Sequence, residues 1–318
     1  MAAQGIDKRK RIFNKYTSQL KILHQNGLLY DKIKYKEGVY ICPICLNEFK
    51  EEDLKDTSEN MLTSEDAPPK SLGGRANTLT CKTCNSRCGH EIDFHLTERL
   101  IELDVRAFRP NTESKAKLTH GEITVQGTIE VDDSGNISII HSEKNNHLKK
   151  LEDYTNTTGK NDITEIEFKP SRVEKLRYEV ALLKSAYILA FEMYGYTLIQ
   201  NKSYDTVREQ LRNPDKEIYP EGFWTKQGSF KKENEGVHYI VSKKFEGFYS
   251  IFSLKTKSTE HRFGVYLPMS STRTNEIIDN LKKQKAGSEL DITSNVGKDY
   301  FETITNMKFI VELMNDKP

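Results

Sequence analysis

The sequence contains few cysteines: only five occur in 318 residues, and all lie between positions 42 and 88. A disulfide-stabilised protein would spread its cysteines along the chain, so their clustering favours reduced thiols that bind a metal in the cytoplasm. No apolar run reaches the ~18 residues that a membrane-spanning helix requires. The first residues are polar and basic rather than typical of a signal peptide, which also predicts a soluble cytoplasmic protein.

A large excess of charge is missing as well. Lys and Arg number 48 and Asp and Glu number 47, which gives a formal net charge of +1. The protein therefore has no overall positive field, and any contact with nucleic acid would depend on local patches. The last two thirds of the chain also lack a phosphate-binding glycine loop, Gly-x-Ser-x-Gly and His-Glu-x-x-His. Common motifs for nucleotide binding, serine hydrolysis and metalloproteolysis are thus absent there.

Residues 1–36 are predicted to contain a basic helix. Its apolar residues recur at helical spacing ahead of Gly27, which is placed to end the helix. They are Ile12, Phe13, Tyr16, Leu20 and Leu23. Residues 1–30 contain six Lys or Arg and one acid, a local net charge of +5. This segment is either an arm that contacts phosphates or an ordinary solvated helix face.

Residues 37–108 are predicted to form a small zinc domain. Two Cys-x-x-Cys pairs, Cys42 with Cys45 and Cys81 with Cys84, can each direct two thiolates at one point. This arrangement suits a tetrahedral Zn²⁺ site. Four thiolates leave no open position for water, so the zinc would be structural and would supply folding free energy.

The chain between and after the cysteine pairs predicts two strands and a helix. Residues 60–66 and 77–81 have strand character and flank a turn rich in proline and glycine. Residues 83–104 carry apolar residues at helical spacing. The spare thiol, Cys88, would lie one turn beyond the last zinc ligand and pack against the zinc site. A ββα unit held by zinc is therefore expected.

Several of these motifs together resemble the zinc-stabilised HNH endonucleases, which cut DNA with a ββα-metal unit. The resemblance covers roughly residues 38–105. It consists of the two cysteine pairs, the acidic pair Glu65-Asp66, Pro68-Pro69, the run Lys70-Ser71-Leu72-Gly73-Gly74, and Asn85 directly after the last cysteine. It implies a metal-dependent endonuclease that hydrolyses DNA phosphodiester bonds with one catalytic Mg²⁺ or Mn²⁺. Its implied metal ligands are Glu65, Asp66 and Asn85, and its implied phosphate contacts are Lys70, Arg75, Lys82 and Arg87.

The chain departs from the family at one position. HNH enzymes place a general-base His directly after the metal-binding acid, where this chain has Asp66. An ordinary Asp carboxyl has a pKa near ~3.9 and is a poor base at neutral pH. Asp66 is therefore a second metal ligand, or His90 or His95 supplies the imidazole, or the unit is inactive and binds nucleic acid or a protein partner. The simplest interpretation of both histidines is a solvated surface position.

Residues 109–318 predict an α+β domain of unknown role, with antiparallel strands and a long helix, which would select the target or contact a protein partner. The helix is expected at residues 171–194, where Ser171 and Glu174 have capping-box spacing and a continuous apolar stripe predicts burial. The polar residues 142–163 predict a flexible connection, and residues 307–313 a final strand. The whole chain is thus expected to belong to the α+β class.

Overall fold

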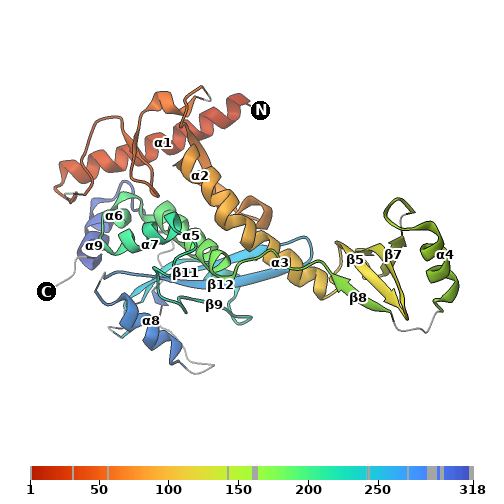
Figure 1. Cartoon of the computed structure of the whole chain (residues 1–318). Helices are drawn as coiled ribbons and strands as arrows, with labels where there is room; N and C mark the ends of the chain where they lie inside the picture. Colours follow the sequence, from red (N-terminus) through yellow and green to blue (C-terminus); the bar gives the residue numbers. More distant parts are fainter. Residues whose placement is uncertain are drawn as a thin grey trace. The chain divides into compact units, whose positions relative to one another are not determined.

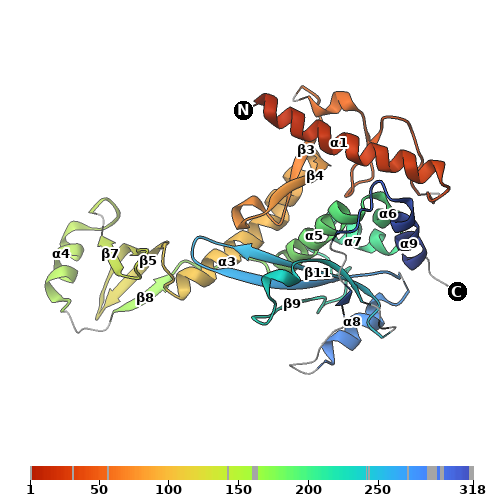
Figure 2. The ribbon, with the colours of Figure 1, turned by 180° about the vertical axis from the view of Figure 1, so that it is seen from behind.

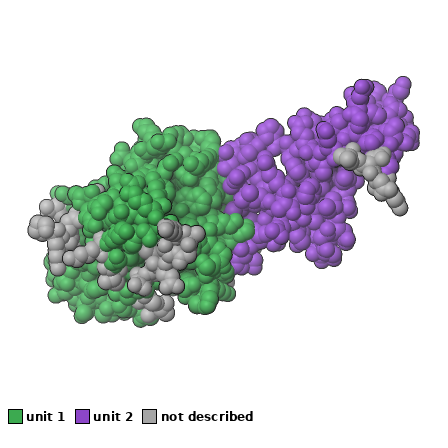
Figure 3. Space-filling view, turned by 90° about the horizontal axis from the view of Figure 1, so that it is seen from below, with its two compact units in different colours: residues 1–96, 174–254, 261–318 green, residues 97–173, 255–260 purple. Residues whose placement is uncertain are grey.

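The computed structural model describes residues 2–30, 32–55, 57–141, 143–159, 164–240, 242, 244–270, 272–284, 292–293 and 297–314. These residues form two compact units, which Figure 3 shows in different colours. Unit 1 consists of residues 1–96, 174–254 and 261–318, and unit 2 of residues 97–173 and 255–260. Both units combine helices with antiparallel strand pairs, so the predicted α+β class is confirmed.

Unit 1 begins with the predicted basic helix, α1 (Ala2–Gln25). The five apolar residues of its stripe are all buried, and Gly27 follows in the left-handed conformation with a φ of 64°. A glycine in that conformation ends many helices, because a residue with a Cβ is strained there. α1 lies along the hairpin of β3 and β4 (Figure 2), so it covers the strands that precede the second cysteine pair.

Two antiparallel hairpins carry the cysteine pairs. The first joins β1 (Tyr40–Ile41) to β2 (Glu48–Phe49), and its turn contains the first pair. The second joins β3 (Leu62–Ala67) to β4 (Arg75–Cys81), which confirms the two predicted strands. The turn of this second hairpin contains a 3-10 helix, η2 (Lys70–Leu72).

The pairing of β3 with β4 contains a bulge. Glu65 lies opposite Thr78 but Asp66 lies opposite Ala76, which leaves Asn77 without a counterpart in β3. A bulge of this kind bends the strand and changes the direction in which its side chains point. Glu65 is buried here, whereas Asp66 is half-buried and Asn77 is exposed.

The segment after the second cysteine pair is helical throughout, as predicted. It consists of α2 (Lys82–Cys88), a π-helical turn, η3 (Gly89–Asp93), and α3 (Phe94–Arg106). A π turn widens an α-helix locally and is frequent at functional sites. The apolar periodicity of the sequence does not reveal it.

The long helix of unit 1 is α5 (Lys175–Tyr194), and its apolar stripe is buried from Val180 onward. The predicted capping box of Ser171 and Glu174 is wrong, because the helix begins only at Lys175 and the Glu174 carboxylate accepts from Arg177. α5 packs against a five-stranded sheet of order β13-β10-β11-β12-β9 (Figure 1). The strands are β9 (Trp224–Lys226), β10 (Gly236–Ile240), β11 (Gly247–Lys255), β12 (Glu260–Leu267) and β13 (Ile292–Thr293).

The predicted strand at residues 307–313 is wrong. This segment belongs to α9 (Ile304–Met314), which buries Met307, Ile310, Val311 and Met314. That spacing places the four side chains on one helix face, whereas a half-buried strand would bury every second residue. Unit 1 also contains α6 (Tyr196–Ile199), α7 (Ser203–Arg212), α8 (Thr274–Lys282), η1 (Glu51–Leu54) and η5 (Lys232–Asn234).

Unit 2 has its own four-stranded sheet, of order β7-β6-β5-β8. Its elements are β5 (Thr112–His120), β6 (Ile123–Val131), β7 (Ile137–His141), β8 (Glu165–Phe168), α4 (Leu148–Thr157) and η4 (Glu143–Asn145). The prediction of a flexible connection at residues 142–163 is wrong for α4, and residues 142 and 160–163 lie outside the described residues. α4 is held because Leu151 and Tyr154, three residues apart, pack into the core of the sheet.

Candidate functional site: a cysteine cluster beside a buried lysine

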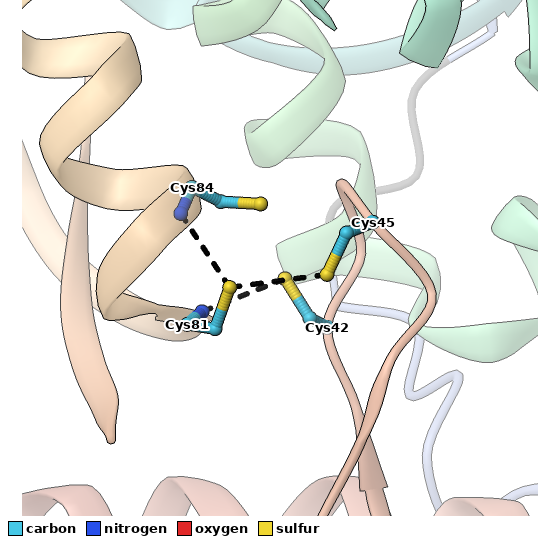
Figure 4. Close-up of side chains that lie close together, drawn as sticks. All are labelled: Cys42, Cys45, Cys81 and Cys84. Carbon is cyan, nitrogen blue, oxygen red and sulfur yellow. Dashed lines mark hydrogen bonds between the residues drawn. The ribbon is translucent and has the colours of Figure 1, made fainter. Parts of the chain in front are cut away.

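The four paired cysteines lie together in unit 1 (Figure 4), with all four sulfurs within 4.8 Å of one another. Cys42 and Cys45 come from the turn between β1 and β2, Cys81 ends β4, and Cys84 lies in the first turn of α2. Zn–S bonds of about 2.3 Å in a tetrahedron separate the sulfurs by about 3.8 Å. The Cys45 and Cys81 sulfurs are 3.8 Å apart, so the cluster could hold a metal ion such as zinc.

Backbone N–H groups also point at the sulfurs. Cys81 donates to the Cys42 sulfur and Cys84 to the Cys81 sulfur, each at 3.5 Å. Burial raises the pKa of the Cys42 thiol well above its ordinary value, so a nearby cation is needed to keep that sulfur as a thiolate. Cys88 is buried but does not belong to the cluster.

Tyrosines of the unit 1 core anchor the first hairpin. Tyr187 of α5 donates to the Pro43 carbonyl at 2.6 Å. The Tyr196 hydroxyl accepts the N–H of Ile41 at 2.8 Å and donates to its carbonyl at 3.2 Å. Because β1 and β2 contain two residues each, these bonds and the cysteine cluster together fix the position of the hairpin.

The acid that the HNH resemblance assigns to the metal, Glu65, has other partners in this structure. Its side chain is 2% exposed, and its Oε1 lies 2.6 Å from the Nζ of Lys184, which is 3% exposed. Its Oε2 accepts from Thr80 Oγ1 at 2.6 Å. The same Lys184 ammonium lies 2.6 Å from Oδ2 of Asp93, in the π turn. Lys184 thus joins the buried Glu65 to Asp93, whose side chain is 17% exposed.

This buried cluster carries two acids and one base, and its pKa shifts follow from that. Burial alone would lower the pKa of Lys184, but Glu65 and Asp93 more than offset it and raise that pKa above its ordinary value. Burial, against the attraction of Lys184 and together with the charge of Glu65, raises the pKa of Asp93 to about 6. Asp93 is therefore more readily protonated than an ordinary aspartate.

The raised pKa of Asp93 predicts a pH dependence of stability. Because its pKa is about 6 in the folded chain, against an ordinary value of 3.8, the folded state binds more protons between those values. The contribution of Asp93 to the free energy of unfolding is therefore highest below about pH 4. It falls by about 3 kcal/mol as the pH rises to about 6. Urea unfolding of the wild type and Asp93→Asn at pH 4 to 7 should show their difference changing by about this amount. A constant difference would contradict the prediction.

The other two predicted metal ligands are placed differently from Glu65. Asn85 donates its side-chain N–H to the Ser64 carbonyl at 2.9 Å and to Thr63 Oγ1 at 3.0 Å, which fastens the start of α2 to β3. The carboxyl of Asp66 is half-buried, and its pKa is raised by burial and then by Glu65, while Lys70 lowers it. Among the described residues, the cysteines are the one group of three or more Cys, His, Asp or Glu side chains close enough to share a metal.

The two histidines differ from each other. His90 is exposed, as predicted. His95 is buried, so its predicted surface position is wrong, and its Nδ1 accepts the backbone N–H of Glu174 at 3.1 Å. Burial lowers the pKa of His95. This histidine helps to fix the start of α5.

The four predicted phosphate contacts remain available to a ligand. Lys70, Arg75 and Lys82 are exposed and Arg87 is half-buried. Within the part of the chain that the structure describes, none of the four side chains forms an ion pair or a hydrogen bond. Lys8 of α1 and Lys184 also lower the pKa of Asp66, so the charges of α1, of α5 and of the β3–β4 turn all act on that carboxyl.

Comparisons with known proteins identify no similar protein. No protein-family model matches the chain, and no curated protein and no solved structure matches it either. The similarity to HNH endonucleases therefore rests on the residues of the sequence alone. In the described ranges, no helix combines the length and the apolar character needed to cross a membrane.

Proposed function

We propose that this chain is a nucleic-acid-binding protein built on a zinc-held ββα unit similar to that of the HNH endonucleases, in which the unit binds nucleic acid without cutting it. The observation that carries the proposal is the contact of Lys184 with Glu65. Glu65 is the acid that the resemblance assigns to the catalytic metal, and the ammonium of Lys184 already neutralises it.

The zinc component is supported by the cysteine cluster. Four thiolates at tetrahedral spacing suit Zn²⁺ and leave no open coordination position. An ion held by Cys42, Cys45, Cys81 and Cys84 would have a structural role: it would tie the first hairpin to the start of α2.

A divalent cation at Glu65 would compete with Lys184. To reach the carboxylate it would have to displace the ammonium, which is 3% exposed and lies between two acids. Lys184 would then keep only Asp93 as an acidic partner, and separating a buried charge from its partner costs free energy. This competition supports a unit that binds nucleic acid without a catalytic ion at Glu65.

The nucleic-acid component is supported by local charge. The net charge of the chain is only +1, yet Lys8, Lys70 and Arg75 lie on α1 and on the β3–β4 turn. Exposed Lys and Arg side chains without acidic partners are suited to phosphate oxygens. We place the phosphate backbone along this turn.

A double substitution tests the proposal. Lys70→Glu with Arg75→Glu is expected to weaken binding of a fluorescent DNA duplex by at least about tenfold and to reduce its salt dependence, because two phosphate contacts are lost. Anisotropy titrations at several salt concentrations measure both. Lys216→Glu, an exposed lysine away from the turn, is the control and should bind like the wild type. Equal affinity of all three proteins, or nicking of plasmid DNA by the wild type with Mg²⁺ or Mn²⁺, would contradict the proposal.

A second candidate function is the endonuclease itself, and the environment of Asp66 favours it. Burial raises the pKa of Asp66, so its carboxylate is a better base near neutral pH than an ordinary one. In that case Asp66 would act as the base, while Glu65 and Asn85 would hold Mg²⁺ or Mn²⁺, which would supply a Lewis acid at the scissile phosphate. Nicking by the wild type that Asp66→Asn and Asn85→Ala abolish, with zinc retained, would support this function.

A further inference from the structure

A pocket of about 520 Å³ lies in unit 1 beside the β3–β4 turn. Its volume is in the range of small-molecule binding sites, about 300 to 1,000 Å³. Its wall combines residues of the turn, of α5 and of β10, among them Pro68, Gly74, Arg75, Leu189, Met193 and Val237. None of these belongs to the cysteine cluster or to the Lys184 cluster.

The turn side of the pocket is closely packed. A Cβ at Gly74 would lie 1.5 Å from the Pro68 carbonyl oxygen, so only glycine fits there. Gly73, one residue earlier, has a φ of 90°, which also favours glycine. The wall that carries Arg75 is therefore held in place by backbone contacts.

The bulge in β4 brings a polar pair to the pocket. Asn77, the residue without a counterpart in β3, donates its side-chain N–H to Glu192 Oε1 of α5 at 2.8 Å. Both residues line the pocket. A regular hairpin would pair Asn77 with β3 and would give its side chain another direction.

The two carboxylates of the pocket have different partners. Glu235 accepts from Arg262 Nε at 3.1 Å and from the Ser253 hydroxyl, so its charge is neutralised. Glu192 accepts from the neutral amide of Asn77 and forms no ion pair with any described residue. Burial raises its pKa, while the hydrogen bond from Asn77 and the charges of Lys15 and Lys8 lower it. Glu192 is thus the acceptor that remains for a ligand with N–H donors.

The pocket has an apolar and a cationic part as well. Leu189, Met193 and Val237 offer apolar surface to a flat ring. Arg75 lines the pocket and is exposed, and its side chain has no ion-pair or hydrogen-bond partner in the described ranges. A guanidinium in this position suits a phosphate group.

We propose that this pocket binds a guanine nucleotide. Guanine presents two adjacent donors, N1–H and the exocyclic amino group, which a carboxylate such as Glu192 can accept together. Adenine and cytosine present an amino group beside an acceptor nitrogen, so they offer Glu192 a single donor. The ring would lie on the apolar wall and the 5′-phosphate would bind Arg75. The guanine could belong to a bound nucleic-acid strand or to a free nucleotide, because both offer the same donors. In the first case the inference rests on the proposed function.

Calorimetric titration of the full chain with GMP, IMP, AMP and CMP tests the base. GMP should bind at least about tenfold more tightly than AMP and CMP, and IMP more weakly than GMP because it lacks the exocyclic amino group. Glu192→Gln should lower GMP affinity at least about tenfold, since an amide offers a donor toward guanine. Glu233→Gln, an exposed Glu outside the pocket, is the control and should leave GMP affinity unchanged.

Oligothymidine with and without one central guanine distinguishes the source of the ligand. A preference for the guanine-containing strand that Glu192→Gln removes supports an unpaired guanine of nucleic acid, and GMP selectivity without that preference supports a free nucleotide. The inference would be overturned if all four nucleotides bound equally or if GMP did not bind. It would also be overturned if Glu192→Gln had a native melting temperature and bound GMP as tightly as the wild type. If GMP binds selectively while DNA binding ignores Lys70 and Arg75, the proposed function fails and the pocket assignment stands.

Discussion

Lys184→Met is expected to lower the free energy of unfolding by about 3–5 kcal/mol, the usual effect of removing one partner from a buried ion pair. Methionine has a similar volume but no charge, so the substitution leaves Glu65 and Asp93 without their shared cation in the interior. Urea unfolding of both proteins at pH 7 measures the change.

Two further variants isolate the charge effect. Glu65→Gln and Asp93→Asn added to Lys184→Met should restore most of the lost stability, because the buried cluster is then neutral. Lys216→Met, at an exposed lysine outside the cluster, should change stability little. A loss below about 1 kcal/mol for Lys184→Met would show that the contact with Glu65 is not the buried ion pair described above.

The second large effect is expected from loss of the metal. The purified chain should contain one zinc per molecule, and Cys81→Ser with Cys84→Ser should abolish it. Structural zinc contributes about 10–16 kcal/mol of binding free energy in small zinc-binding peptides. The cysteine cluster is also the link between the first hairpin and the start of α2. We therefore expect a large fall in melting temperature, measured by circular dichroism alongside elemental analysis.

Cys88→Ser is the matched control for the metal. Cys88 is buried, like three of the four ligands, but lies outside the sulfur cluster, so this variant should retain one zinc. A wild-type protein that contains no zinc, or one whose melting temperature is unchanged after zinc is removed with a chelator, would rule out a structural metal.

The cysteine cluster could be predicted from the sequence because its geometry is local. Each Cys-x-x-Cys pair directs two sulfurs to one point, and the strands between the pairs have clear turn residues. The partner of Glu65 could not be predicted in the same way, because Lys184 is distant in the chain and reaches Glu65 only through tertiary packing. The one available signal was a lysine within the apolar stripe of α5, which indicates a buried charge that needs a partner.

The errors in the secondary structure have a similar origin. In α4 the polar composition hid two apolar residues, Leu151 and Tyr154, that pack against the sheet of unit 2. In α9 a short apolar run suggested a strand, although its buried positions follow the helical period. The bulge at Asn77 has no sequence pattern of its own, so the Asn77–Glu192 contact and the pocket it borders emerged only from the structure.

The tyrosine contacts to the first hairpin limit how this chain could be divided. Pro43 and Ile41 are bonded to Tyr187 and Tyr196, and Glu65 is neutralised by Lys184, all three from α5 and α6. An isolated fragment ending near residue 108 would keep every cysteine but expose these groups to water. A metal-binding segment transferred to another protein would therefore have to include α5 as well.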